Sequence, residues 1–185
     1  MRVFQTLVLA VTLILAACSH EQSYVPGEIE VIASTSVNST PAIVSLDSLG
    51  QRTLNSILLK VEEVQIHKDS AGWKTIAEPH QVFDFLQLTD TITFVLADTL
   101  VEPGYYSQLR LIVAETNEVV IDGVSYPLVV PSGTQTGVKL NLDVAINGGE
   151  TARIYLEFDE ETAVIENANG FYLRPSFRLN IELQP

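Results

Sequence analysis

The chain has 185 residues, of which 46% are hydrophobic and 18% are charged, and its formal net charge is −13. This apolar content is sufficient for one compact domain with a real core, so the composition excludes a disordered chain. The excess of acidic residues disfavours nucleic acid and anionic lipid surfaces as partners, because binding to them needs clustered Lys and Arg. We therefore expect a single folded domain and no nucleic-acid partner.

The first 17 residues have the layout of a secretory signal peptide. Arg2 supplies a positive charge, an apolar run extends from Leu7 to Ala17, and small residues end it. The run is shorter than the roughly 20 residues that a membrane-spanning helix needs. Residues 1–17 therefore predict export followed by cleavage.

The residues at the cleavage point, Leu15, Ala16, Ala17 and Cys18, resemble the lipobox of bacterial lipoproteins. The resemblance implies that a peptidase cuts before Cys18 and that its thiol carries a diacylglycerol, with palmitate among the acyl chains expected. Each buried CH₂ group contributes about 0.8 kcal/mol, so several chains would anchor the protein without a spanning segment. Ser19 stands where many lipoproteins of the inner membrane have aspartate, so we expect the outer membrane, on either face.

Residues 18–27 predict a lipidated tether, and residues 28–185 predict one β-sandwich domain. The tether is polar, has no periodicity and ends in Pro-Gly. From Glu28 onward, short apolar runs rich in β-branched and aromatic residues alternate with turn residues. This pattern predicts an all-β fold, an immunoglobulin-like antiparallel β-sandwich of about seven to nine strands.

Four apolar segments in the first half of the domain predict strands. They are residues 56–68, 73–77, 91–97 and 105–113. The first two predict a hairpin, because only a short turn joins them, and residues 98–104 would connect the last two. Alternation in the fourth segment would turn Tyr106, Gln108 and Arg110 away from the core. A short helix is conceivable within residues 80–90.

Residues 117–130 carry the strongest local signal for a hairpin. Asp122 and Gly123 stand between two apolar runs and suit the two positive-φ positions of a type I′ turn. Pro127 cannot donate a hydrogen bond to a neighbouring strand. Its strand is therefore expected to lie at an edge of the sheet or to carry a bulge.

The last third of the chain predicts three further strands. Residues 137–146 alternate cleanly, which predicts a strand with Lys139 facing away from the core. Residues 147–149 form a turn that leads into a strand at 151–159. Residues 171–183 close the domain with another apolar run.

The loop before residues 137–146 resembles a phosphate-binding loop only superficially. Gly133 and Gly137 are separated by three residues instead of four, Val138 stands before Lys139, and a strand follows where a helix is needed. Ser132 lacks the G-x-S-x-G context of a serine nucleophile, so an ordinary turn is the favoured interpretation. Should the domain have a binding loop, its expected residues are Ser132, Gly133, Thr134, Gly137 and Lys139.

No pattern predicts a metal, cofactor or catalytic site. The acidic run that includes Asp159 and Glu161 lacks the alternating Asp/Asn and glycine of a calcium loop, so a solvated acidic turn is favoured. The three histidines show no spacing typical of zinc ligands. We therefore expect a protein without a cofactor that is not an enzyme.

The order of motifs resembles a family of bacterial lipoproteins that carry the domain of unknown function 4382. The shared features are Trp73, residues 83–88, Pro103, Gly104, Tyr106, Arg110, Leu111, Asp122-Gly123, residues 130–140, Phe158-Asp159, Tyr172, Leu173 and Pro175. The resemblance covers the chain from about Glu28 to the C-terminus. It implies a fold similar to transthyretin and assigns no catalytic residue.

Together these features predict a lipoprotein of the bacterial cell envelope, held to the membrane through the lipid on Cys18. The favoured function is a non-enzymatic binding or structural module that meets a protein or glycan through loops at one end. One alternative is a fimbrial or adhesive subunit, since some transthyretin-like lipoproteins polymerise by strand exchange. Another is a metal-dependent envelope enzyme or accessory protein that uses acidic loop residues such as Asp159 and Glu161.

Overall fold

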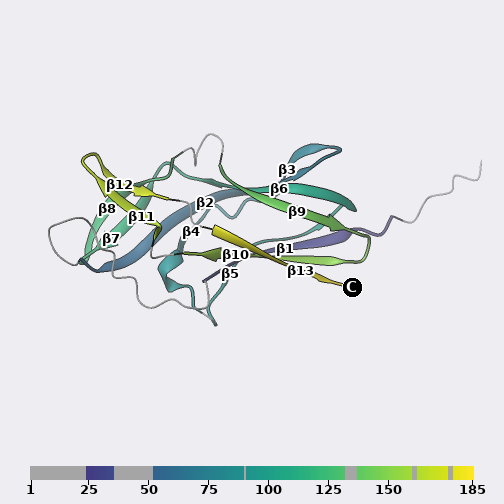
Figure 1. Cartoon of the computed structure of the whole chain (residues 1–185), viewed down its shortest axis with the longest axis horizontal. Coiled ribbons are helices and arrows are strands. Elements are labelled where there is room, and N and C mark those ends of the chain that lie inside the picture. Colours follow the sequence, from purple (N-terminus) through teal and green to yellow (C-terminus); the bar gives the residue numbers. More distant parts are fainter. Residues whose placement is uncertain (1–23, 36–51, 90, 132–136, 160–161, 175–176) are drawn as a thin grey trace, which may run out of the picture.

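The computed structural model describes residues 24–35, 52–89, 91–131, 137–159, 162–174 and 177–185. These residues form thirteen strands in two sheets (Figure 1). The strands are β1 (Gly27–Thr35), β2 (Leu54–Lys68), β3 (Gly72–Ala77), β4 (Gln81–Asp84), β5 (Phe94–Val101), β6 (Gly104–Val113), β7 (Asn117–Ile121), β8 (Val124–Val129), β9 (Val138–Ile146), β10 (Thr151–Phe158), β11 (Val164–Asn167), β12 (Gly170–Leu173) and β13 (Phe177–Gln184). The predicted all-β sandwich is confirmed, and the part of the chain described here holds no helix able to cross a membrane.

The number of strands exceeds the seven to nine that we expected. The additional strands β4, β11 and β12 have only four residues each. Segments of this length are too short for a period of two to stand out in the sequence. The C-terminal segment also divides, because β12 joins one sheet and β13 joins the other.

The smaller sheet has the strand order β13-β10-β1-β5, and the larger has the order β11-β12-β8-β7-β2-β6-β9, with β3 and β4 also paired to β2. Most pairs are antiparallel, but β1 with β10 and β8 with β12 are parallel. The expectation of a purely antiparallel sandwich is therefore wrong at these two pairs. Parallel partners are remote in the chain, so local alternation does not reveal them.

The core lies between the two sheets, and the aromatic ring of Phe85 is at its centre. Phe85 begins a short 3₁₀ helix, η1 (Phe85–Gln87), where we considered a helix within residues 80–90. The carboxylate of Asp84 caps this turn by accepting a hydrogen bond from the Leu86 amide at 3.1 Å. The Phe85 ring centroid lies 5.2 Å from that of Phe158 and 6.0 Å from that of Phe177. The turn thus inserts one ring between the sheets.

Tyr106 is 3% exposed, so the prediction that it faces away from the core with Gln108 is wrong. Gln108 pairs with His67 and Tyr106 pairs with Lys68, which leaves Ser107 as an extra residue on β6. Such a bulge changes the phase of the alternation. Tyr106 consequently shares the inner face with Leu109. In a regular strand these two residues, three positions apart, would lie on opposite faces.

The Asp122-Gly123 hairpin is confirmed, with positive φ angles of 51° and 78°. Pro127 differs from expectation, because β8 lies inside the sheet and its register with β7 has no shift. The parallel strand β12 pairs only with Leu128 and Val129. No described strand therefore pairs with position 127 on the side to which a backbone N–H would point. Proline is tolerated there because its missing N–H leaves no hydrogen bond between strands unmade.

One further strand is longer than predicted, and another agrees with the prediction. Strand β5 continues to Val101 through residues that we assigned to a connection, so only Glu102 and Pro103 link β5 to β6. Strand β9 is confirmed as predicted, with Leu142, Val144 and Ile146 buried and Lys139 exposed. The turn after β9 crosses from the larger sheet to the smaller one.

The molecule is elongated, and the described chain starts at one end of its long axis (Figure 1). We name this end, formed by residues 24–27 and the turns at 69–71, 102–103 and 147–149, the tether end. There the Gly149 amide donates to the Pro26 carbonyl at 2.9 Å, and the Tyr24 hydroxyl donates to the Val101 carbonyl at 3.4 Å. The hairpins β7–β8 and β11–β12 form the opposite, far end.

Candidate functional site

Two rows of side chains cross the outer face of the larger sheet beside the β2–β3 hairpin. In each row, neighbouring residues are cross-strand partners on β3, β2, β6 and β9. The first row is Thr75, Gln65, Arg110 and Lys139, and the second is Trp73, His67, Gln108 and Asn141. We name these eight residues the platform. None of them is buried, whereas their neighbours Ile66 and Leu109 on the inner face are.

Hydrogen bonds hold the first row in place. The Arg110 Nε atom donates to Oε1 of Gln65. The Gln65 amide nitrogen donates to Thr75 at 3.1 Å, and the Thr75 hydroxyl donates to Glu63 at 2.9 Å. The Arg110 guanidinium also lies 4.2 Å from the ring centroid of Trp73, within the range of a cation–π contact. The row is therefore organised before any ligand arrives.

The second row is ordered by its aromatic pair. The His67 ring meets the Trp73 ring edge to face, with centroids 5.2 Å apart. Atom Nδ1 of His67 and Oγ of Ser107 share a hydrogen bond at 3.0 Å. Ser107 is the bulged residue of β6, so the same irregularity that turns Tyr106 inward brings this hydroxyl to the histidine.

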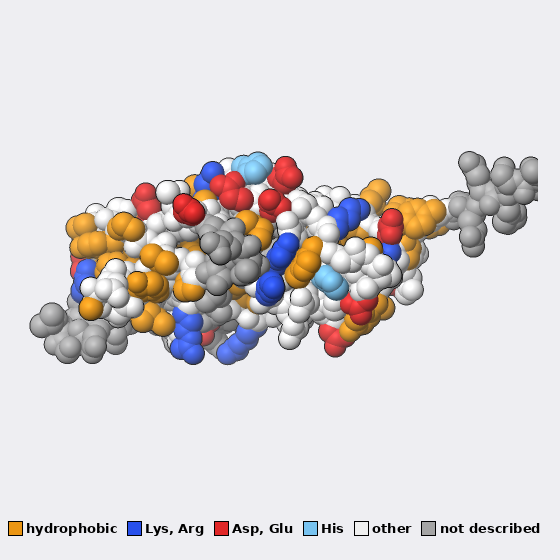
Figure 2. Space-filling model, turned by 90° about the horizontal axis from the view of Figure 1, so that it is seen from above, with side chains coloured by type: hydrophobic (Ala, Val, Ile, Leu, Met, Phe, Trp, Pro, Cys, Tyr) orange, Lys and Arg blue, Asp and Glu red, His pale blue; other side chains and the backbone are white. Residues whose placement is uncertain are grey.

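The platform differs in charge from the rest of the protein. Arg110 and Lys139 lie opposite each other on β6 and β9, in a chain whose net charge is −13, and Glu63 contacts the other end of the first row at Thr75. Near the middle of this face, basic, histidine and hydrophobic side chains lie next to one another (Figure 2). The surface offers amide, guanidinium and ammonium donors around one indole ring.

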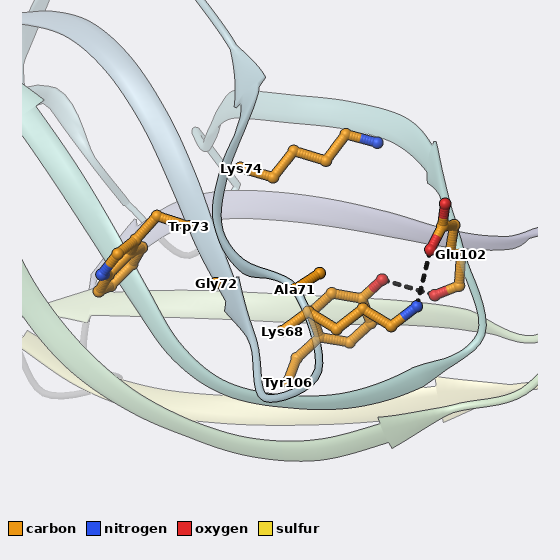
Figure 3. Close-up of a pocket in the computed structure, with 7 residues that line it drawn as sticks. All are labelled: Lys68, Ala71, Gly72, Trp73, Lys74, Glu102 and Tyr106. Carbon is orange, nitrogen blue, oxygen red and sulfur yellow. Dashed lines mark hydrogen bonds and ion pairs between the residues drawn. The ribbon is translucent and has the colours of Figure 1, made fainter.

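A hollow of about 270 Å³ lies at the tether end, beside the β2–β3 hairpin (Figure 3). Its lining residues are Lys68, Ala71, Gly72, Trp73, Lys74, Glu102 and Tyr106. Figure 3 shows the Lys68 ammonium reaching the Glu102 carboxylate, at 2.8 Å, while the Tyr106 hydroxyl donates to the Glu102 carbonyl. Trp73 also lines the hollow, but its indole points away from Lys68, Glu102 and Tyr106, so the hollow is a feature separate from the platform.

Three groups of the hollow, Lys68, Glu102 and Tyr106, have pKa values shifted away from neutrality. The hydrogen bond from Lys68 lowers the pKa of Glu102 and raises the pKa of Lys68. Burial raises the pKa of the Tyr106 hydroxyl. A general acid or base works best when its pKa lies near the operating pH, and these shifts move all three groups away from neutrality. The hollow suits binding better than proton transfer.

The predicted loop residues are only partly described. Ser132, Gly133 and Thr134 lie outside the described residues. Gly137 has a positive φ of 69° immediately before β9, and Lys139 is exposed on β9 in the first platform row. The structure thus brings the end of the predicted loop next to a surface that sequence reasoning did not assemble.

The sequence carried only a weak signal for the other platform residues. Gln65 and His67 alternate with buried Val64 and Ile66, which marks an outer sheet face. The register that places Arg110 and Lys139 beside them joins strands far apart in the chain. No local pattern contains that register, so the cluster was missed.

The acidic and histidine candidates are not brought together. Asp159 accepts a hydrogen bond from Thr162 at 3.2 Å, and Glu161 lies outside the described residues, as does Cys18. His80 contacts Glu62 instead of another histidine. Within the described ranges, no group of three or more His, Cys, Asp or Glu side chains could hold a metal ion.

Comparison with known proteins places the chain in a family. Residues 47–175 match the family described as "Domain of unknown function (DUF4382)". No match was found among curated proteins or among solved structures. The matched segment spans β2 to β12 and includes every platform residue. The chain therefore belongs to the family of the domain of unknown function 4382.

Proposed function

We propose that this protein is a lipoprotein of the bacterial cell envelope, anchored in the outer membrane through Cys18, that binds a glycan without catalysing a reaction. The observation that carries the proposal is the platform, an organised polar and aromatic surface on an outer sheet face. This surface differs from the loops at one end that we expected from the sequence. The anchor itself rests on the lipobox resemblance of residues 15–18.

The chemistry of the platform favours a glycan. A sugar ring can pack its C–H groups on the indole of Trp73 and take hydrogen bonds from the neighbouring guanidinium and amide groups. Because Arg110, Gln65 and Thr75 already hold one another, little side-chain freedom is lost on binding. The two rows extend across four strands, β3, β2, β6 and β9, so the surface suits an extended chain of sugars.

Replacing Trp73 by alanine should weaken glycan binding at least about tenfold, which corresponds to about 1.4 kcal/mol. The substitution removes the indole and the cation–π partner of Arg110. Binding is measured on an array of bacterial envelope polysaccharides and then by calorimetry with the best ligand. Tyr105→Ala is the matched control, because Tyr105 is an aromatic residue outside the platform that is 43% exposed. A glycan that both variants bind equally well would contradict the assignment of Trp73 to the binding surface. If cross-linking at the platform captures a protein instead, the ligand is a protein and the glycan proposal is wrong.

Replacing Cys18 by serine should release the protein from membranes, because the thiol that would carry the lipid is lost. Membrane fractionation and the intact mass of the processed protein measure the effect. Ser19→Ala is the control and should stay acylated and membrane-bound. A Cys18→Ser protein that is still processed and sediments with membranes would contradict lipid anchoring.

A further inference from the structure

Exposed apolar side chains surround the tether end. They are Tyr24, Val25, Leu100, Tyr105 and Leu183, with exposed fractions of 57%, 53%, 63%, 43% and 51%. We name these five residues the tip ring. Their strands all start or stop at this end, where β1 and β6 begin and β5 and β13 end. Figure 2 shows hydrophobic side chains gathered at the end of the molecule where the described chain starts.

The position of the ring relative to the tether is constrained. Five residues lie between Cys18 and Tyr24, and the six residue steps that join them span at most roughly 20 Å when fully extended. The hydrogen bonds at Tyr24 and Pro26 fix the chain to the tether end. A lipid on Cys18 would therefore keep the tip ring within a short distance of the leaflet.

The side chains of the ring suit the boundary between headgroups and acyl chains. Tyr24 and Tyr105 have an apolar ring with a polar tip, as do the aromatic residues enriched at membrane interfaces. Their hydroxyls are hydrogen-bonded to Val101 and Asp143. Leu100 and Leu183 add aliphatic surface on opposite edges of the smaller sheet.

The charges at this end select the kind of lipid. Asp69 and Glu102 lie in turns of the tether end, Glu150 directly follows the turn at 147–149, and the ammonium of Lys68 is already paired with Glu102. Anionic headgroups would be repelled by these carboxylates. A zwitterionic leaflet has no net charge, so apolar contact with it is unopposed.

We propose that the tip ring docks on a zwitterionic phospholipid leaflet, at the headgroup–acyl boundary, and holds the domain upright on the membrane. The inference rests on the lipid anchor of the proposed function. It gives the anchored domain a defined orientation, with the tether end in the interface and the far end in the aqueous phase. The platform then faces sideways, where it is accessible to a ligand.

The test uses the full lipidated protein, reconstituted in phosphatidylcholine vesicles with brominated acyl chains. Since the lipid occupies Cys18, a single introduced cysteine carries an environment-sensitive fluorophore. Leu100→Cys and Leu183→Cys probe the ring, and Val82→Cys and Val124→Cys are controls with exposed fractions of 52% and 51%. Bromine should quench the ring probes at least about twofold and leave both controls unchanged, because quenching needs contact with acyl chains. Ring probes as unquenched as the Val124 probe would overturn docking.

A second variant separates docking from anchoring. Val25→Glu combined with Leu100→Glu, in the Leu183→Cys background, should remove the quenching while the protein still sediments with the vesicles. Persistent quenching in this variant would overturn docking by the ring. If the intact mass of the wild-type protein shows no acyl chains and the protein stays in the supernatant, the lipid anchor is refuted. Docking, which rests on the anchor, is then refuted as well. A labelled Leu183→Cys protein that is acylated and sediments with the vesicles, but is not quenched, would refute docking alone.

Discussion

Replacing Phe85 by alanine should lower the free energy of unfolding by about 3–5 kcal/mol. The side chain is 1% exposed, and its ring contacts Phe94, Phe158 and Phe177 from strands of the smaller sheet. Removal of the ring leaves a cavity between the sheets and ends three aromatic contacts, each worth about 0.5–1.5 kcal/mol beyond the buried area. Urea unfolding followed by circular dichroism measures the loss.

Val82→Ala is the matched control for this substitution. Val82 lies on β4 just before Phe85 and is 52% exposed, so its truncation should change stability by no more than about 0.5 kcal/mol. Equal losses for the two variants would show that Phe85 does not bridge the sheets. A large loss at Phe85 alone would support the packing of the sandwich around η1.

Replacing Gly137 by alanine should cost about 2–5 kcal/mol of folding free energy. The residue has a positive φ of 69°, which costs an L-residue about 1–2 kcal/mol. The added Cβ would also lie 2.9 Å from the Leu111 carbonyl oxygen and 2.8 Å from Ile112 Cδ1, and relief of such overpacking costs about 1–3 kcal/mol. Because Gly137 precedes β9, the same shift should disturb Lys139 on the platform and weaken ligand binding.

Gly123→Ala separates the two contributions. Gly123 also has a positive φ, of 78°, but the space that a Cβ would fill is open among the described residues. Its substitution should cost only about 1–2 kcal/mol, from the backbone conformation. If the two alanine variants unfold at the same urea concentration, then the close approach of Gly137 to β6 does not exist in solution.

The fold could be predicted where the signal is local. The alternation in β9 predicted the buried face of that strand, and Asp122-Gly123 predicted the turn between β7 and β8. Both features depend only on neighbouring residues. Tyr106 was assigned to the wrong face because a bulge shifts the alternation without any mark in the sequence. Pro127 was expected at an edge of the sheet or at a bulge, because the short reach of β12 was unknown.

The site shows the same division between local and remote information. Lys139 was selected from its own strand, and the structure places it opposite Arg110. Trp73 stood out as the only tryptophan in the chain, but its partners His67 and Arg110 are set by the pairing of three strands. The amino-acid pattern alone thus named individual members of the platform and could not assemble it.

Composition, alternation and turn residues were enough to predict an all-β domain and its strongest hairpin, and the order of motifs resembled the family whose match covers residues 47–175. These properties depend on residues that are close in the chain, so short sequence patterns can predict them. The parallel pairs, the ring of Phe85 between the sheets, the platform and the tip ring depend on which distant strands meet. Pairing of distant strands is decided by the packing of the whole core, so these features exist only in the folded molecule.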